Sequence, residues 1–597
     1  MADEEQLQKL AINHVMFGLG SRVIMTSRNK SIIKSNKTLE YEVKPLDNVR
    51  SLELFSRHAF RRNPPPDDYV NLSRQIISTT GGLPLALEVI GSLVYRQNKA
   101  SWYDVLNNLR EIPPEKVQDK LKISYNALNH EQQQIFLDIA CLFVDKDKTN
   151  ALYMWKDCGF RPDYSIQVLV CMSLIKITDH NKFWMHDQLR DLGRKIVRGD
   201  TRLTDPRKQS RLWVPETANN IIGTKERKKA VEAICLCEPT RVYTSKEFSR
   251  LPNIRFLILK WGNFKGDFAN QFSELRYMTC TMVSREFLAI NFHPSNLVVL
   301  QLTWSLITEE WAGWSQFKVA KKLKVLDISH CSNMTRTPNF SDYLSLERLN
   351  LGYCEKLTEV DGSLKKLKCL IYSDAYGCKN LRELPKGIGG LQKLEYLYLG
   401  NCEKLRKLPK SFARVTSLVE LDLSHTAITR LPDSIGNQNH LSVLKLQFTK
   451  IDELPNSIGN LRNLSLSFYR MCPNLTAIQG LGSLDLLEEL KISRCPKIGS
   501  LDDLSDLKKL KSLIIQCCVE LQAVEGLDEL ETLTILSFNG CRSLKSFSNL
   551  FNSKVPDKCI LHIGGCPNLE AGLFYGMFST YKEQKVGGKR RKRKRGV

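Results

Sequence analysis

The sequence lacks a long apolar run. Its longest, IQVLVCMSLI at residues 166–175, is far shorter than the roughly 20 apolar residues of a membrane-spanning helix. The opening residues, MADEEQLQKL, are acidic and contain no apolar core, which excludes a secretory signal peptide. A hydrophobic content of 42% and a charged content of 25% are ordinary for a soluble protein. We therefore expect a soluble, intracellular chain.

The 18 cysteines include no Cys-x-x-Cys pair, so the usual start of a zinc site is missing. Irregular spacing, as in the disulfide frameworks of small secreted domains, is missing too. Instead, half of the cysteines recur every 23 to 25 residues, and two threonines fill the one gap in phase. These eleven positions are Cys331, Cys354, Cys378, Cys402, Thr426, Thr449, Cys472, Cys495, Cys518, Cys541 and Cys566. We predict a buried structural ladder that hydrogen-bonds backbone, in a reducing compartment.

Leucines accompany this period. The clearest copy reads Leu394-x-x-Leu397-x-Leu399-x-x-Cys402-x-x-Leu405, which is the pattern of a leucine-rich repeat: a short strand, a buried small polar residue and a return arm. Because each coil buries its apolar face only against its neighbours, the pattern predicts a solenoid. We expect a horseshoe whose concave sheet binds other molecules.

Aromatic residues gather between the leucines. Counted in phase, the concave face carries Tyr353, Tyr372, Tyr376, Tyr396, Tyr398 and Phe448. Tyrosine clusters among mixed charges are common where proteins bind proteins, so we predict a partner-binding site. The alternative is ordinary strand tyrosine, since strands favour aromatic residues.

The charge balance is strongly basic, with 87 Lys and Arg against 64 Asp and Glu, or +23. Seven of the cations form one run after Gly587-Gly588: Lys589, Arg590, Arg591, Lys592, Arg593, Lys594 and Arg595. Self-repulsion and the lack of apolar residues predict a disordered tail. The run is typical of a nuclear import signal or a weak polyanion contact; the alternative is a solvated end.

The half before the repeats alternates helix and strand. Residues 22–26 predict a buried strand. The glycine turn at residues 81–82 leads into an apolar helix with Pro84 in its first turn, where a missing N–H does no harm. Residues 131–143 predict a buried helix, residues 172–177 and 182–185 a hairpin, and Asp187 caps a further helix. Helices followed by a hairpin favour a winged-helix unit.

Four motifs in this half match one family in order. They are the strand ending at Arg28 (GSRVIMTSR), GLPL at residues 82–85, FLDIACLF at residues 136–143 and MHD at residues 185–187. With DLGR at residues 191–194, PRKQSRLW at residues 206–213 and the repeats, they resemble plant disease resistance proteins. These intracellular immune receptors join a TIR domain, an NB-ARC nucleotide switch and leucine-rich repeats.

The resemblance implies an α/β fold, a partial NB-ARC followed by the leucine-rich-repeat horseshoe. Residues 1–62 would be a remnant of the nucleotide-binding subdomain, residues 63–128 the helical ARC1 subdomain and residues 129–200 the winged-helix ARC2 subdomain. A linker at residues 201–245, repeats at residues 246–570 and a tail at residues 571–597 would follow.

In the intact family, ADP or ATP is the cofactor. The resemblance implies that Arg28 contacts the γ-phosphate, Pro84 the base, and His186 the β-phosphate of ADP in the off state. The alternatives are an exposed loop arginine, a helix-start proline and a satisfied histidine beside the capping Asp187.

Two parts of the family's switch are missing. No G-x-x-x-x-G-K-[ST] phosphate loop occurs, although its amides and lysine normally hold the phosphates and its hydroxyl holds Mg²⁺. The apolar strand ending in paired aspartates is missing too, and no TIR domain precedes it. We expect an N-terminally truncated receptor that binds nucleotide weakly or not at all, has no NTPase activity and no metal site.

The function implied is that of a plant innate immune receptor, whose repeats recognise a pathogen effector or a guarded host protein. One alternative is a regulatory or decoy fragment that pairs with intact receptors. Another is a basic nuclear nucleic-acid-binding protein, although the positive charge outside the tail is interspersed with acidic residues. We expect cytoplasmic residence, with nuclear import if the basic run is a signal.

Overall fold

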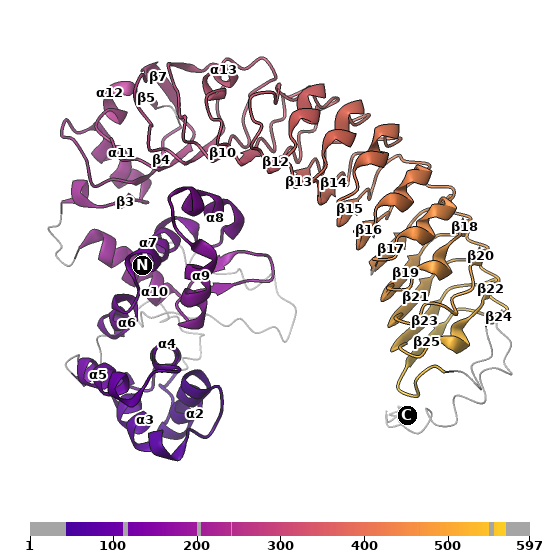
Figure 1. Ribbon diagram of the computed structural model, residues 1–597, viewed down its shortest axis with the longest axis horizontal. Coiled ribbons are helices and arrows are strands. Elements are labelled where there is room, and N and C mark those ends of the chain that lie inside the picture. Colours follow the sequence, from indigo (N-terminus) through magenta and orange to yellow (C-terminus); the bar gives the residue numbers. More distant parts are fainter. Residues whose placement is uncertain are drawn as a thin grey trace, which may run out of the picture. The chain divides into compact units, whose positions relative to one another are not determined.

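The structure is a computed structural model that describes residues 43–110, 117–199, 205–239, 241–464, 466–547 and 554–568 (Figure 1). The chain forms two compact units, Met1–Asn129 with Leu169–Leu174, and His130–Val168 with Ile175–Val597. The predicted strand at residues 22–26, Arg28 and the basic run at residues 589–595 lie outside the described residues.

The first unit is helical in its described part. Its helices are α2 Asn48–Phe60, α3 Asp67–Thr80, α4 Pro84–Val94, α5 Lys99–Arg110 and α6 Val117–Asn126. Asp47 caps α2 by accepting the Arg50 N–H at 2.8 Å. Pro84 is the first residue of α4, as predicted. Phe55 of α2 packs in the same core as Trp102 of α5, so the helical unit begins before the expected boundary at residue 63.

The second unit begins with the winged helix. Its elements are α7 His130–Asp138, the π-helical turn η3 Ile139–Phe143, α8 Lys148–Asp157, α9 Pro162–Cys171, β1 Lys176–Ile177, β2 Phe183–Trp184 and α10 Asp187–Arg198; the end of α9 belongs to the first unit. β1 pairs antiparallel with β2, as the predicted hairpin requires, but β1 is shorter than residues 172–177. His186, not Asp187, is the N-cap of α10: its Nδ1 accepts the Gln188 N–H at 3.2 Å. Asp187 is the first helical residue and accepts the same N–H at 3.0 Å.

The repeats build one parallel sheet of 16 strands among the described residues. The sheet starts with β3 Arg211–Leu212, β4 Ala233–Cys237, β6 Phe256–Lys260, β8 Tyr277–Thr281 and β10 Val299–Gln301. It continues through β11 Val325–Asp327, β12 Arg348–Asn350, β13 Tyr372–Asp374, β14 Tyr396–Tyr398, β15 Glu420–Asp422 and β16 Val443–Lys445. It ends with β17 Leu466–Arg470, β19 Glu489–Ser493, β21 Ser512–Gln516, β23 Ile535–Asn539 and β25 Ile560–Gly564. The predicted leucine-rich-repeat solenoid is therefore confirmed.

The sheet begins earlier than expected. Residues 201–245, predicted to be a linker, contain β3, helix α11 Pro215–Gly223 and β4, and β4 pairs with β6 in register. The apolar run of β4, AICLC, lacks the leucine spacing of the later coils, so its strand was hidden from the repeat pattern. Arg211 and Ile234 already belong to the folded repeat region, since both are buried.

Short connecting elements complete the coils. Beside the first strands lie β5 Val242–Thr244, α12 Ser245–Phe248, β7 Asn263–Asp267, β9 Leu288–Ile290, α13 Gly313–Phe317 and the 3-10 turn η4 Pro206–Lys208. The later return arms hold the 3-10 turns η5 Gly362–Lys366, η6 Lys386–Gly390, η7 Lys410–Arg414, η8 Asp433–Asn437, η9 Asn456–Asn460, η10 Leu481–Ser483 and η11 Leu527–Glu529. The strand pairs β18 Ala477–Ile478 with β20 Ser500–Leu501 and β22 Ala523–Val524 with β24 Ser546–Phe547 lie there too. Within the repeat region the sheet lines the inner side of an arc and these arms the outer side (Figure 1).

The structure places all eleven ladder residues at one point of successive coils. The thiol of Cys402 donates to the Ala375 carbonyl of the preceding coil at 3.3 Å, and the Cys378 thiol reaches Leu351 in the same way at 3.1 Å. Thr426 differs, because its hydroxyl donates to Leu423 of its own coil at 2.7 Å. All 18 cysteines are free thiols.

Candidate protein-binding surface

The inner face of the repeat sheet is defined by the strand residues that flank a buried centre. In β12 to β16 the central side chain points into the core, while its two neighbours are half-exposed on the other face in nearly every strand. The register aligns Arg348, Tyr372, Tyr396 and Glu420 in one row across the sheet. A second row holds Asn350, Asp374, Tyr398 and Asp422.

The winged helix covers the inner face of the first strands. Phe256 and Tyr277 start β6 and β8 and would face outward, but both are buried. The ring of Phe143, at the end of η3, contacts them edge-on with centroid distances of 5.2 Å and 5.6 Å. This part of the sheet is therefore occupied by the chain itself.

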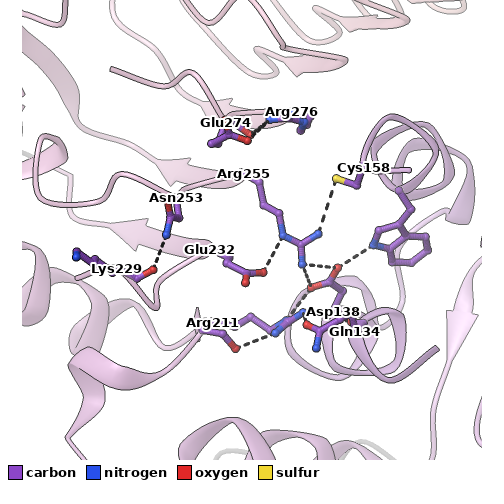
Figure 2. Close-up of polar contacts among 12 residues, drawn as sticks. Gln134, Asp138, Cys158, Arg211, Lys229, Glu232, Asn253, Arg255, Glu274 and Arg276 are labelled. Carbon is purple, nitrogen blue, oxygen red and sulfur yellow. Dashed lines mark hydrogen bonds and ion pairs between the residues drawn. The ribbon is translucent and has the colours of Figure 1, made fainter. Parts of the chain in front are cut away.

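A buried ion cluster joins the same two regions (Figure 2). Asp138, at the end of α7, lies 2.7 Å from Arg211 Nε of β3 and 3.4 Å from Arg255 Nη2, just before β6. The Trp155 indole N–H of α8 donates to the same carboxylate at 2.8 Å. Arg255 also pairs with Glu232 at 2.9 Å, so the guanidinium is shared between two carboxylates.

The cluster keeps Asp138 ionised. Burial alone would raise the pKa of Asp138, but the charges of Arg211 and Arg255 and the hydrogen bonds from Trp155 and Arg211 outweigh burial, so the pKa lies below its ordinary 3.8. A buried charge with these partners is tolerated, whereas one without them is costly. This cluster is not predicted from the sequence; the one available signal is an aspartate inside the apolar run FLDIACLF.

The contact with the winged helix reaches the coil of β12. The Tyr153 hydroxyl of α8 donates to Glu347 at 2.9 Å, and Lys324 pairs with the same glutamate at 2.7 Å. Asp157 pairs with Arg276 at 3.3 Å. Tyr153 also lies near the charge of Arg348 at the start of β12. In β13, β14 and β16 both residues that flank the buried centre are partly exposed, so these strands present their inner faces.

Three of the predicted tyrosines lie together on this open inner face. The Tyr372 and Tyr398 rings are 5.5 Å apart, and Tyr396 lies between Tyr372 and Glu420 in the register. The Arg348 guanidinium lies 3.8 Å above the Tyr372 ring. Tyr398 donates its hydroxyl to Glu420 at 3.0 Å. We call Tyr372, Tyr396 and Tyr398 the tyrosine cluster.

The acidic residues in these rows have structural roles. Asp374 accepts the Tyr376 N–H at 2.8 Å and Asp422 accepts the Ser424 N–H at 2.9 Å, and each contact holds the turn after its strand. Burial raises the pKa of Asp374. Glu420 is paired with Lys445 at 2.7 Å. The carboxylates are thus already bonded to groups of the same chain. The partly exposed rings of the tyrosine cluster are the groups on this face that a partner could contact.

The other three predicted aromatic residues lie past the strand ends, not within them. Tyr353 and Phe448 have left-handed backbones with φ of 57° and 58°, and Tyr376 lies one residue before the equivalent corner at Gly377. The strands are only three residues long here, so counting in phase overestimated the face. Tyr376 contacts Tyr353 edge-on and accepts a hydrogen bond from Asn401 at 2.7 Å.

The left-handed corners form a second exposed edge. The Trp304 ring stacks on His330 at 3.8 Å, and His330 stacks on Tyr353 at 4.7 Å, with 7° between the planes in both pairs. Trp304 is 57% exposed and Tyr353 46%. The rings of His425 and Phe448 stack in the same way, with their centroids 4.1 Å apart. We call Trp304, His330 and Tyr353 the aromatic edge.

The residues proposed to bind nucleotide are divided among three parts of the chain. Arg28 is outside the described residues, Pro84 belongs to the first unit and His186 to the second. The Gly82 turn before Pro84 packs against its own chain, because a Cβ there would lie 2.3 Å from the Leu46 carbonyl oxygen. Within the described part of the first unit, the helix start at Pro84 alone does not replace a phosphate loop.

Among the described residues, no group of three or more His, Cys, Asp or Glu side chains is placed to hold a metal ion. Within the same residues, no helix is both long enough and apolar enough to cross a bilayer.

Residues 129–201 match the family described as Disease resistance protein Roq1-like, winged-helix domain, and residues 420–568 match a leucine-rich repeat region. TMV resistance protein N of Nicotiana glutinosa is 31% identical over 386 residues, which cover 64% of this chain and 33% of that protein. Disease resistance protein RPV1 of Vitis rotundifolia is 32% identical over 398 residues, which cover 61% of this chain and 28% of that protein. Disease resistance protein RPP2A of Arabidopsis thaliana is 30% identical over 383 residues, which cover 62% of this chain and 28% of that protein.

The aligned parts span a third or less of these relatives. The winged-helix prediction is confirmed by the family match, and the repeat prediction by both the match and the sheet. The chain is therefore related to the plant disease resistance proteins of the NB-ARC and leucine-rich-repeat type.

Proposed function

We propose that this chain acts in plant innate immunity as a receptor that binds a protein through the tyrosine cluster. That protein is a pathogen effector or a host protein that the receptor guards. The observation that carries the proposal is the tyrosine cluster itself, three rings on adjacent strands of the inner face. Tyrosine supplies large contact area with few rotatable bonds and is enriched at binding hot spots.

The division of the inner face supports this proposal. Its first strands are covered by Phe143 and by the Asp138 cluster, and the coil before β13 is held by Tyr153. The tyrosine cluster and Lys445 lie on the partly exposed strands that follow. The proposed site is therefore β13 to β16.

The test is binding of candidate effectors and host targets to the full chain. Tyr372→Ala, Tyr396→Ala and Tyr398→Ala together should abolish binding of a partner that binds the natural chain. Tyr164→Ala on α9, which is 57% exposed, is the matched control. Full retention of binding by the triple variant would place the partner elsewhere.

The nucleotide switch is proposed to be inactive in the polypeptide of residues 1–597. The reasons are the missing phosphate loop and the closed turn at Gly82. Isothermal titration with ADP and with ATP should give no binding or millimolar affinity, and no ATP hydrolysis should follow. A sub-micromolar Kd would overturn this part of the proposal and leave the binding surface untouched.

A regulatory role is the second candidate, proposed for the polypeptide of residues 1–597 itself. A chain that binds a partner but cannot switch would act by pairing with an intact receptor. Co-expression should then change the cell death triggered by that receptor, and the chain alone should trigger none.

The cell compartment is also a proposal. We propose cytoplasmic residence with import through residues 589–595. Deleting residues 589–597 from a fluorescent fusion should remove its nuclear signal, and an unchanged distribution would reduce the run to a solvated end.

A further inference from the structure

The return arms of three successive coils carry a concentration of positive charge. Residues 362–416 hold twelve Lys and Arg against four Asp and Glu, and all twelve cations are exposed. Two of the acids, Asp374 and Glu395, lie in or beside the strands rather than on the outer turns. The turns η5, η6 and η7, which carry five of these cations, lie on the outer side of the arc, opposite β12 to β14 (Figure 1).

We define the basic patch by the cations of turns η5, η6 and η7 and the loop after η5: Lys365, Lys366, Lys368, Lys386, Lys410 and Arg414. Glycines of η6 let the turns pack closely. A Cβ at Gly387 would lie 2.8 Å from the Lys365 Cβ, and one at Gly389 would lie 2.2 Å from the Ser411 carbonyl oxygen. Lys368 Nζ donates to the Gly390 carbonyl at 2.9 Å. The cations of neighbouring coils are thus held side by side.

No salt bridge neutralises these cations within the described residues, and two acidic residues nearby, Glu359 and Glu383, line one surface pocket with Lys365 and Lys386. Just outside the patch, cross-coil ion pairs are regular: Arg336 pairs with Glu359 at 3.2 Å, and Arg430 pairs with Glu453 at 3.2 Å. Inside the patch, no salt bridge is formed by the six cations within the part of the chain that the structure describes. Like charges held together without ion pairs repel each other and lower the stability of the folded state. An anion bound at the patch would reduce this repulsion.

An exposed leucine adjoins the patch. Leu344 is 55% exposed and occupies the place in its coil that Lys368 occupies in the next, two residues before the buried leucines Leu346 and Leu370. An apolar side chain beside several lysines is suited to a lipid headgroup region, where the leucine inserts and the lysines face anionic groups.

We propose that the basic patch is a docking surface for an anionic lipid bilayer, which goes beyond the protein-binding function proposed above. Charge complementarity selects an anionic surface. Nucleic acid is less favoured because the aromatic side chains of residues 362–416 lie on the inner face, at the corner after β13 or in the core, so none is exposed on the turns of the patch where a base could stack. A convex arc meets a flat surface over few coils, and the patch is confined to three.

The experiment is vesicle co-sedimentation of the full chain, with phosphatidylcholine alone and with about 30 mol% phosphatidylserine added. Binding should require phosphatidylserine and should be lost when salt is raised from about 0.1 M to about 0.5 M. The variant Lys365→Glu, Lys386→Glu and Lys410→Glu should bind about tenfold more weakly or worse. Leu344→Ser should bind about threefold more weakly at about 0.1 M salt.

The matched control reverses three exposed cations outside the patch, Lys450→Glu, Arg462→Glu and Lys497→Glu. Its net charge equals that of the patch variant and both keep residues 589–595, so bulk charge and tail cancel in the comparison. The control should bind within about twofold of the natural chain. Equal loss in both triple variants would overturn the proposal. So would a patch variant that keeps vesicle binding but loses binding to a random-sequence DNA duplex, which would assign the patch to nucleic acid.

Discussion

Asp138 forms ion pairs with Arg211 and Arg255 and accepts a hydrogen bond from the Trp155 indole. We therefore expect the interface between the winged helix and the repeats to depend on this residue more than on any other. Arg211 is 1% exposed at its side chain and Asp138 2%, so neither can turn to water if its partner is removed. Breaking such a pair is more harmful than never having formed it, because the remaining charge stays buried.

We expect Asp138→Ala to lower the free energy of unfolding of the second unit by about 3–5 kcal/mol. Urea unfolding followed by tryptophan fluorescence measures it, since Trp155 donates to this carboxylate. The control is Asp163→Ala, which breaks an exposed pair with Lys156 and should cost about 1 kcal/mol or less. A loss for Asp138→Ala no larger than that of the control would contradict the buried cluster.

The same residue predicts a dependence on pH. Because the folded pKa of Asp138 lies below its ordinary 3.8, the ionised carboxylate adds stability that is fully present above that pH. This stability is lost as the pH falls through the folded pKa. The difference in unfolding free energy between the natural chain and Asp138→Asn should therefore be constant near neutrality and shrink in acid below 3.8. A difference that grows in acid would reverse the sign of the shift.

Cys402 gives the matching prediction for the ladder. Its side chain is fully buried and its thiol donates to Ala375, so asparagine, which has a donor of similar reach, should be tolerated at this position. Cys402→Leu should cost about 1–3 kcal/mol through overpacking and an unpaired carbonyl. Thermal unfolding of the two variants, with Cys171→Leu at an exposed thiol as control, makes the comparison. Equal stability of the two Cys402 variants would show that the hydrogen bond to Ala375 does not contribute to stability.

At the scale of elements, the winged helix depends on one close helix crossing. Gly193 of α10 faces the π-helical turn η3, and a Cβ there would lie 2.6 Å from the Ala140 Cβ and 3.2 Å from the Phe136 ring. The wide turn η3 carries Phe143 toward the repeats at its other end. The crossing of α10 therefore fixes the element that covers β6 and β8.

Gly193→Ala is expected to destabilise by about 1–3 kcal/mol, although alanine in a helix normally gains about 1 kcal/mol over glycine. The reason is that close packing outweighs helix propensity when the neighbour is another Cβ. Calorimetry of this variant beside Gly362→Ala, where a Cβ would meet nothing within 4 Å, separates the two effects. An increase in stability of the Gly193→Ala variant would show that η3 can move to accommodate the added methyl group.

The elements that could be predicted from sequence are those with a period. Each coil repeats its leucines and its ladder residue, so the sheet could be predicted from Leu323 onward. The cluster of Asp138, Arg211 and Arg255 could not, because its members lie 73 and 117 residues apart and follow no period. The left-handed corners were missed for another reason: tryptophan, histidine and tyrosine stand there, where glycine is expected.

At the scale of the whole molecule, the reactivity of the free thiols measures how well the coils are packed. Burial raises the pKa of Cys402 and of Cys518 to about 12, so little thiolate forms near neutral pH. Cys171 and Cys517 are exposed. Reactivity toward an alkylating reagent should therefore divide the cysteines by position rather than by local sequence.

Native alkylation followed by mass spectrometry should label Cys171 and Cys517 first. The buried ladder thiols should react after denaturation, all within the same unfolding transition if the coils unfold together. Denatured protein supplies the control for complete labelling. Ladder cysteines recovered as disulfides from freshly purified protein would contradict both the packing and the reducing compartment.

The left-handed corner has a consequence for how such a surface can change. One residue per coil turns outward at the same place, and its backbone is set by the corner rather than by its side chain. Replacing Tyr353 or Phe448 leaves the leucines and the thiols of its coil in place, since neither is part of that core. The corners thus form a row of surface positions whose side chains can be replaced while the leucine core and the thiols stay in place, and where rings stack, as in Trp304, His330 and Tyr353, a replacement changes the surface of two neighbouring coils.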